Sequence, residues 1–193
     1  MSGHPAIFVD RDGTLNVEVN YLSRPEELVL IPGAAKAISR LAQAGFCVII
    51  ITNQSAIARG IITETDLEVI HEELCRQLAS EGAHVDGIYH CPHHPEAGSP
   101  KFRIKCECRK PAPGLLLQAA SEHNISLKES IMIGDNITDL QAGWNAGCRS
   151  ALVLTGYGKE TWSNASPEVR NQIGFTGQDI SEVVHQLLEE IRA

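Results

Sequence analysis

The feature that most constrains the fold of this chain is a continuous apolar run, Phe46–Ile51, rich in β-branched side chains. Such a run suits a strand buried on both faces, as in a parallel sheet covered by helices. Further apolar runs recur along the chain, and amphipathic or capped segments typical of helices separate them. This alternation predicts an α/β protein with a three-layer, Rossmann-like parallel sheet. The expected strands are 6–9, 46–51, 85–89, 130–133 and 151–154, and the expected helices are 33–44, 63–80, 113 onward, 138–146 and 180–191.

The length of the chain limits its number of domains, and its net charge limits its partners. Its 193 residues predict one domain, 1–193, with one core. The net charge of −8 argues against nucleic acid as a partner, since phosphate backbones favour basic surfaces. With no apolar run long enough to span a membrane, and no signal segment or exposed apolar stripe, we expect a cytoplasmic monomer. The stretch 156–177 has the weakest pattern, and we expect loose order there.

Four polar segments follow predicted strands or precede a predicted helix. They are Asp10-Arg11-Asp12-Gly13-Thr14, Thr52–Ser55, Arg109–Pro111 and Gly134–Asn136. In an open parallel sheet, ligands bind beyond the carboxyl ends of the strands. We therefore expect these segments to meet in one crevice.

The chemistry of these segments is complementary. Asp10, Asp12 and Asp135 offer the hard oxygen ligands that suit Mg²⁺. Lys110 offers a point positive charge, and Thr52 offers a hydroxyl donor. A cation and donors of this kind stabilise charge on a transferring phosphoryl group. Each segment alone is compatible with an ordinary turn or cap, so the prediction of a phosphoryl site depends on their joint occurrence.

A second group of residues predicts a zinc site. Cys91, His93, Cys106 and Cys108 match the three sulfurs and one imidazole of a closed tetrahedral site. His94 is the alternative ligand, and free thiols with a surface histidine are the alternative to a metal. A closed site has no open coordination position, so this zinc is predicted to be structural. It would pin the loop of about 91–108 and place the two cations that follow it over the crevice.

The four segments together resemble the haloacid dehalogenase (HAD) superfamily of phosphatases, over residues 6 to about 154. The resemblance implies that Asp10 attacks phosphorus to form an aspartyl-phosphate and that Asp12 is the general acid and base. It also implies that Asp10, the main-chain carbonyl of Asp12 and Asp135 hold Mg²⁺, and that Thr52 and Lys110 bind the phosphoryl group. Asp139, which follows, either supports the metal ligands from behind or is an ordinary polar helix position, and we favour the polar helix position.

The zinc loop points to one family within this superfamily. The strings Cys91-Pro92-His93-His94-Pro95 and Cys106-x-Cys108-Arg109-Lys110-Pro111 resemble the D-glycero-D-manno-heptose 1,7-bisphosphate 7-phosphatase family, which lacks a large cap domain. Some members carry Lys where this chain has Asn136, which supplies no charge. The resemblance, with Asn136 added as a candidate, implies these substrate contacts: Glu18, Val19, Asn20, Tyr21, Asn53, Gln54, Ser55, Arg109 and Asn136.

The implied activity is Mg²⁺-dependent removal of the C7 phosphate from a heptose bisphosphate, a small phosphorylated sugar. The product, heptose 1-phosphate, would serve the synthesis of nucleotide-activated heptose for lipopolysaccharide or another surface glycan. Histidinol-phosphate phosphatase, which shares the zinc loop, is the alternative enzyme. A non-catalytic, zinc-stabilised interaction module is the alternative from another functional class.

Overall fold

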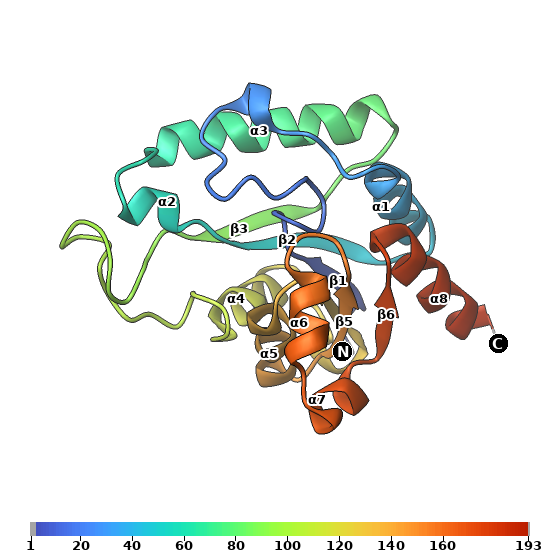
Figure 1. Cartoon of the computed structure of the whole chain (residues 1–193). Coiled ribbons are helices and arrows are strands. Elements are labelled where there is room, and N and C mark those ends of the chain that lie inside the picture. Colours follow the sequence, from blue (N-terminus) through green and yellow to red (C-terminus); the bar gives the residue numbers. More distant parts are fainter. Residues whose placement is uncertain (1–2, 193) are drawn as a thin grey trace.

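A six-stranded parallel sheet forms the centre of the computed structural model, which describes residues 3–192. The strand order is β3-β2-β1-β4-β5-β6, so the direction of strand succession reverses between β1 and β4. Crevices for ligands form at such a switch point, outside the carboxyl ends of the strands. The predicted three-layer α/β fold is confirmed, and helices cover the two faces of the sheet (Figure 1).

The strands and helices lie close to the predicted ranges. The strands are β1 (Ala6–Val9), β2 (Cys47–Asn53), β3 (Gly87–Cys91), β4 (Ile131–Gly134), β5 (Arg149–Val153) and β6 (Phe175–Gly177). The α-helices are α1 (Ala34–Gln43), α2 (Ser55–Ala58), α3 (Glu64–Ser80), α4 (Gly114–Glu122), α5 (Ile137–Ala146), α6 (Gly158–Asn164), α7 (Pro167–Gln172) and α8 (Ile180–Arg192). Short 3₁₀ turns lie at Pro25–Glu27 and Leu127–Glu129.

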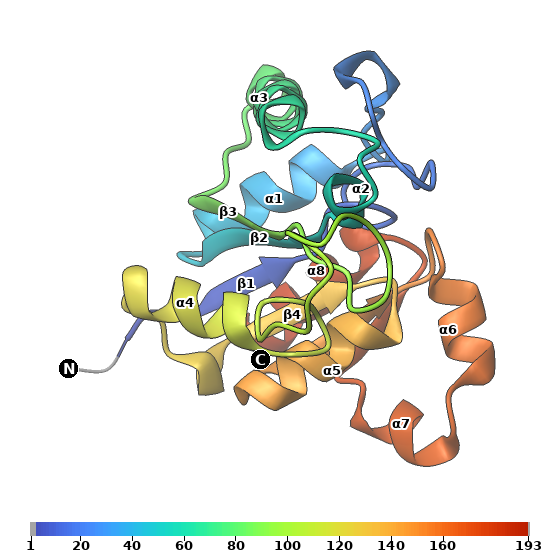
Figure 2. The ribbon, with the colours of Figure 1, turned by 90° about the vertical axis from the view of Figure 1, so that its left-hand side faces the viewer.

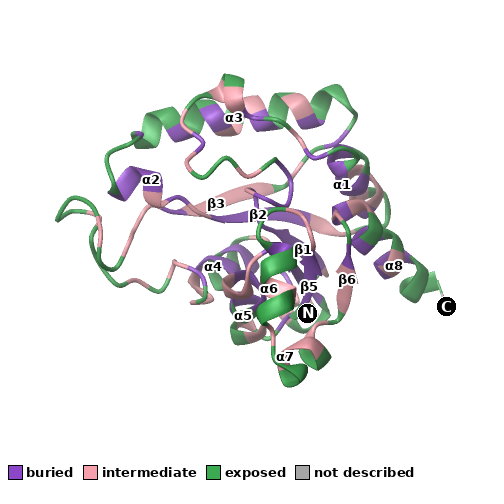
Figure 3. Ribbon diagram, viewed as in Figure 1, coloured by how far each residue is buried: buried purple, intermediate pink, exposed green. Residues whose placement is uncertain are grey.

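Two apolar clusters sandwich the sheet. Alternate residues of β1 show the division, since Ile7 and Val9 belong to the larger cluster and Ala6 and Phe8 to the smaller one. The larger cluster packs β1 and β2 against α1, α3 and α8, and the smaller packs them against α4 and α5. Figure 2 shows α4 and α5 on the side of the sheet opposite α1 and α3. The central strands are buried on both faces, as their continuous apolar runs predict (Figure 3).

The largest difference from the prediction concerns residues 156–177. This stretch contains α6, α7 and β6, and β6 pairs with β5 in register as an edge strand. The expectation of loose order was therefore wrong. The segment docks through specific contacts that no apolar period reveals, such as the Thr161 hydroxyl donating to the main-chain oxygen of Asp135 at 2.9 Å.

Strand β3 begins two residues later than predicted, and this places Cys91 at its end. Its neighbour in the sheet at that level is Asn53, the last residue of β2. The zinc-loop sequence therefore leaves the sheet beside the polar end of β2. Within the described residues, the structure has no helix long and apolar enough to cross a membrane.

Candidate active site

The turn after β1 brings the first and last acidic segments together. Gly13 has φ 78°, and a Cβ there would lie 2.2 Å from Oδ2 of Asp135, so only glycine permits this approach. Gly156 lies against Gly13 beside the same carboxylate, and a Cβ there would be 2.0 Å from Oδ2 of Asp135. The main-chain N–H of Tyr157 donates to that oxygen at 2.7 Å. Asp135 is therefore held in a backbone slot beside the end of β1.

Lys110 supplies the buried positive charge of the site. Its Nζ donates to Oδ1 of Asp10 at 2.5 Å and to the main-chain oxygen of Ile51 at 2.7 Å. It also pairs with Oδ1 of Asp139 at 2.7 Å, so all three ammonium hydrogens have acceptors. Burial opposes the charged form, but the Asp10 and Asp139 carboxylates outweigh burial and raise the pKa of Lys110. The expectation that Asp139 is an ordinary polar helix position was wrong, because its side chain is buried in this ion-pair cluster.

Three carboxylates lie near this single lysine, which pairs directly with Asp10 and Asp139. Oxygens of Asp10, Asp135 and Asp139 lie within 4.8 Å of one another. Burial and the neighbouring carboxylates raise the pKa of Asp135 to about 8, and burial raises that of Asp10 to about 7 although Lys110 opposes the shift. A buried cluster with more negative than positive charge is a site that a divalent cation stabilises. The residues present therefore fit Mg²⁺.

The Asp12 carboxylate lies outside this cluster and is held by donors. The Arg11 guanidinium donates to both of its oxygens, at 2.7 and 2.9 Å from Nη2. Asn16 donates to Oδ1 at 3.0 Å, and Gln54 donates to Oδ2 at 2.8 Å. Burial favours the neutral acid, but Arg11 and these donors outweigh burial and lower the pKa of Asp12. Asp12 is thus held as a carboxylate at the pocket wall.

The end of β2 and the residue that follows it organise the adjoining wall. Asn53 clamps the backbone of Lys110: its Oδ1 accepts from the main-chain N–H at 3.1 Å, and its Nδ2 donates to the main-chain oxygen at 3.2 Å. Gln54 donates to the buried Thr52 hydroxyl at 2.8 Å as well as to Asp12. These two predicted substrate contacts therefore use side-chain amide atoms to position catalytic groups.

A pocket of about 200 Å³ lies between these walls. It is lined by every predicted catalytic and magnesium residue, and by the predicted substrate contacts except Val19, all of them in the described part of the chain. Val19 instead lines a neighbouring surface hollow with Val17 and Ile31. Asn136 lines the pocket, but its Oδ1 caps α5 by accepting from the main-chain N–H of Thr138 at 3.1 Å. The cap gives Asn136 a structural role that lysine at this position does not have.

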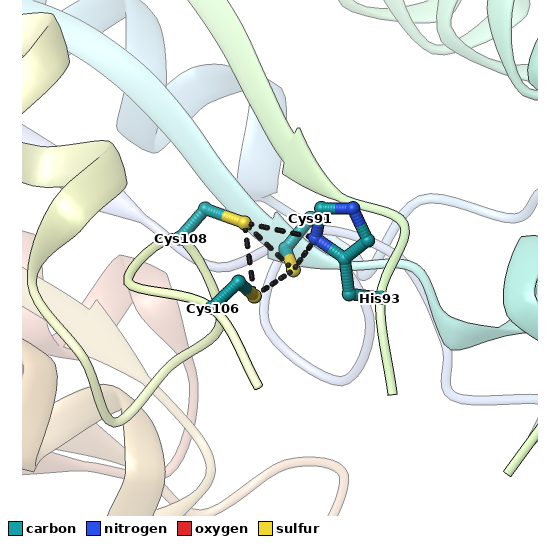
Figure 4. Close-up of side chains that lie close together, drawn as sticks. All are labelled: Cys91, His93, Cys106 and Cys108. Atoms are coloured by element: carbon teal, nitrogen blue, oxygen red, sulfur yellow. Dashed lines mark hydrogen bonds between the residues drawn. The ribbon is translucent and has the colours of Figure 1, made fainter. Parts of the chain in front are cut away.

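The predicted zinc ligands converge on one point (Figure 4). The Cys108 sulfur lies 3.1 Å from that of Cys91, 3.2 Å from that of Cys106 and 3.3 Å from Nδ1 of His93. A tetrahedral zinc with Zn–S bonds of about 2.3 Å requires sulfur separations of roughly 3.8 Å. The observed donors are slightly closer than this and surround a common centre, so the set fits zinc with a small expansion.

His94, the alternative ligand, faces away from the cluster. Its Nδ1 accepts from the main-chain N–H groups of Glu96 and Ala97, at 3.1 and 3.0 Å. The preference for His93 over His94 therefore agrees with the geometry.

The zinc loop reaches the pocket through Arg109. This residue directly follows Cys108, lines the pocket and donates from Nη1 to the main-chain oxygen of His93 at 3.1 Å. The same loop continues into the buried Lys110. The Cys–His cluster therefore lies directly before the segment that brings both cations to the pocket.

Comparison with known proteins places this site in a family. A HAD-hydrolase-like family model matches residues 107–177. A D-glycero-beta-D-manno-heptose-1,7-bisphosphate 7-phosphatase of Yersinia pestis is 46% identical over 79% of this chain and 81% of its own length. A protein of the same name from Escherichia coli K12 is 44% identical over 93% and 91%. The chain belongs to this family of HAD phosphatases. The family consists of phosphoric monoester hydrolases, which confirms the predicted enzyme class.

A solved structure supports the same assignment. The D,D-heptose 1,7-bisphosphate phosphatase of Bordetella bronchiseptica, complexed with magnesium and phosphate, has a TM-score of 0.85. Its sequence is 38% identical, and the match covers 96% of this chain and 99% of that one.

Three residues of the candidate site were missed in the sequence. Arg11 lies inside the Asp10–Thr14 string and Asn16 lies two residues beyond it, but neither side chain was assigned to Asp12. Tyr157 lines the pocket from the stretch expected to be loosely ordered. The signal for the first two was their position one and four residues from Asp12. Tyr157 carried no such signal, because only the fold brings it there.

Proposed function

We propose that this protein is a Mg²⁺-dependent phosphatase that removes the C7 phosphate of D-glycero-D-manno-heptose 1,7-bisphosphate, with residues 1–193 acting as one catalytic domain. The observation that carries the proposal is the meeting of Asp10, Asp12, Lys110 and Asp135 around one small pocket. The names of the relatives supply the sugar bisphosphate. The product, heptose 1-phosphate, would enter the synthesis of a nucleotide-activated heptose.

In the proposed reaction, a carboxylate oxygen of Asp10 bonds to phosphorus as the bond from phosphorus to the ester oxygen breaks. Asp12, in its protonated form, gives a proton to the departing sugar oxygen and becomes the carboxylate that Arg11, Asn16 and Gln54 stabilise. A water then attacks the aspartyl-phosphate, its proton passes to Asp12, and phosphate leaves. Lys110 and the Thr52 hydroxyl stabilise charge on the phosphoryl oxygens. Mg²⁺, held by Asp10, Asp135 and the main-chain carbonyl of Asp12, would supply the positive charge that offsets repulsion between carboxylate and phosphate.

Arg109 is the proposed contact for the second phosphate. It lies at the pocket edge and is held there by the His93 carbonyl, and a guanidinium binds an oxyanion through two hydrogen bonds. Glu18, Asn20, Tyr21 and Ser55 line the same pocket and are proposed to contact the sugar.

The test is a direct comparison of substrates. Purified protein is assayed with Mg²⁺ on the heptose bisphosphate and on histidinol phosphate, and the heptose product is examined for which phosphate is lost. We expect preference for the bisphosphate, loss at C7 and no turnover by Asp10→Asn. Preference for histidinol phosphate would favour the related enzyme, and no turnover of any phosphomonoester would favour a non-catalytic module.

A further inference from the structure

The described structure contains a half-buried histidine that the proposed mechanism does not use. His71 lies on the face of α3 that packs on the sheet, between the buried Leu67 and Leu74 in the helical repeat. Its Nε2 is 3.2 Å from Nη1 of Arg11. His90 of β3 is the other ring beside it, with centroids 6.0 Å apart.

Arg11 is an unusual neighbour, because its side chain is 1% exposed. It is among the largest fully buried side chains of the protein. A buried guanidinium requires acceptors for its N–H groups, since each unpaired group has lost its water. Arg11 uses Nε and Nη2 on Asp12, which leaves Nη1 to His71.

The pairing with His71 has a defined direction. Burial, with Arg11 and His90 nearby, lowers the pKa of His71 to about 3. A neutral ring can present Nε2 as an acceptor, and the Arg11 N–H then donates to it. The contacts therefore form a chain from α3 to the pocket wall, in which His71 accepts from Arg11 and Arg11 donates to Asp12.

We propose that His71 is a positioning residue, which holds the Arg11 fork and thereby fixes the Asp12 carboxylate for proton transfer. The two oxygens of Asp12 are fixed by this fork from one side and by Asn16 and Gln54 from the others. Without the acceptor on α3, the guanidinium loses one of its anchors and turns toward other partners. The carboxylate then loses the orientation from which it reaches the leaving oxygen.

This inference rests on the proposed role of Asp12, and leaving-group chemistry tests it separately from the sugar substrate. The parameter kcat/KM reports the first step, in which the ester oxygen departs. Dinitrophenolate leaves without a proton, whereas phenolate or an alkoxide needs one. A misplaced acid therefore slows the reaction of phenyl phosphate and leaves dinitrophenyl phosphate almost unchanged.

The variants are His71→Leu, which removes the acceptor, and His71→Gln, whose side-chain oxygen can accept from Arg11. His84→Leu is the matched control, because His84 is exposed. We expect His71→Leu to lower kcat/KM about 10- to 100-fold for phenyl phosphate and less than about 2-fold for dinitrophenyl phosphate. His71→Gln should restore most of the ratio between the two substrates, and His84→Leu should not change it.

A merely structural role predicts a different result. A loss of folded protein lowers both rates by the same factor, and thermal unfolding measured on each variant shows it. An unchanged ratio in His71→Leu, or no recovery of the ratio in His71→Gln, would overturn the proposal. Failure of the wild type on the heptose bisphosphate, with the aryl ratio still responding, would reject the proposed substrate and retain the role of His71.

Discussion

Replacement of Lys110 by methionine tests the ion-pair cluster at the centre of the site. The Lys110 side chain is 2% exposed. Its ammonium group contacts Asp10 at 2.5 Å, Asp139 at 2.7 Å and the Ile51 carbonyl at 2.7 Å. Methionine fills a similar volume but donates no hydrogen bond. Lys110→Met therefore leaves two buried carboxylates without their cation.

The expected magnitude follows from burial. Removing one partner of a buried ion pair costs about 3–5 kcal/mol, because the other partner stays desolvated. We expect a loss of this size in the free energy of unfolding, measured with urea at pH 7 without Mg²⁺. Arg76→Met is the matched control. Arg76 pairs with Glu73 at 2.7 Å, but its side chain is 67% exposed, and solvent screening leaves such surface pairs little effect on stability.

The pH dependence provides a second readout. The pKa of Asp10 is already raised to about 7, above its ordinary value of 3.8, so the folded state holds the proton more tightly than the unfolded state. Such a group makes the protein less stable as pH rises between these values. Without Lys110 the pKa of Asp10 rises further, so stability falls more steeply with rising pH. The difference in free energy of unfolding between the wild type and Lys110→Met should therefore shrink toward pH 4. If Lys110→Met and Arg76→Met cost the same at pH 7, the ion-pair interpretation of this cluster is wrong.

Three further predictions concern the metals and the substrate. Because the pKa of Asp135 is raised to about 8 in the metal-free protein, that protein should lose stability as pH rises from about 4 to 8. The increase in melting temperature caused by Mg²⁺ should grow over the same range, and Asp135→Asn should reduce this growth. An equal Mg²⁺ effect at both ends of the range would count against the site. Cys106→Ser should lower bound zinc, measured by elemental analysis, and lower kcat/KM at least about 10-fold, the scale at which a misplaced catalytic group is felt; full activity in zinc-free protein would contradict a role for zinc in holding the loop. Arg109→Ala should reduce kcat/KM for the heptose bisphosphate by about 10-fold or more and hardly change that for a sugar monophosphate, because only the bisphosphate carries the second anion; equal losses on both substrates would remove the proposed contact.

The parts of the fold that were predictable carry a strong local signal. The apolar run of β1 is fully buried, and that of β2 is buried from Val48 to Ile51. The capping box of Thr63 and Asp66 begins α3. The segments α6, α7 and β6 lacked such a signal. They are short, and contacts with distant residues hold them, such as the Tyr157 N–H donating to Asp135. Sequence periodicity detects an element that buries one face, and short elements of this kind bury too little to produce a period.

The candidate site likewise contains residues that the sequence predicts and contacts that it does not. The residues predicted to be catalytic could be grouped from the sequence because Asp10, Asp12 and Thr52 lie at or just after a strand end, and parallel strands bring those ends to one edge. Lys110 was grouped with them from its place before a predicted helix. Their partners were not predictable. The clamp between Asn53 and the Lys110 backbone joins residues 57 apart in sequence, and the contact between His71 and Arg11 joins residues 60 apart. Such contacts depend on the packing of α3 and of the zinc loop on the sheet, which residue type alone does not specify.

The zinc loop addresses a physical difficulty of the phosphoryl site. The site needs a buried cation among carboxylates, but the segment that precedes Lys110 is mostly exposed, and of its apolar residues Phe102 packs against the main core. Apolar burial therefore cannot hold this segment firmly. Zinc ligands at Cys91 and Cys108 would tie its two ends to the edge of the sheet without a core of its own. Bound zinc would then help to confine Lys110 to its place beside Asp10.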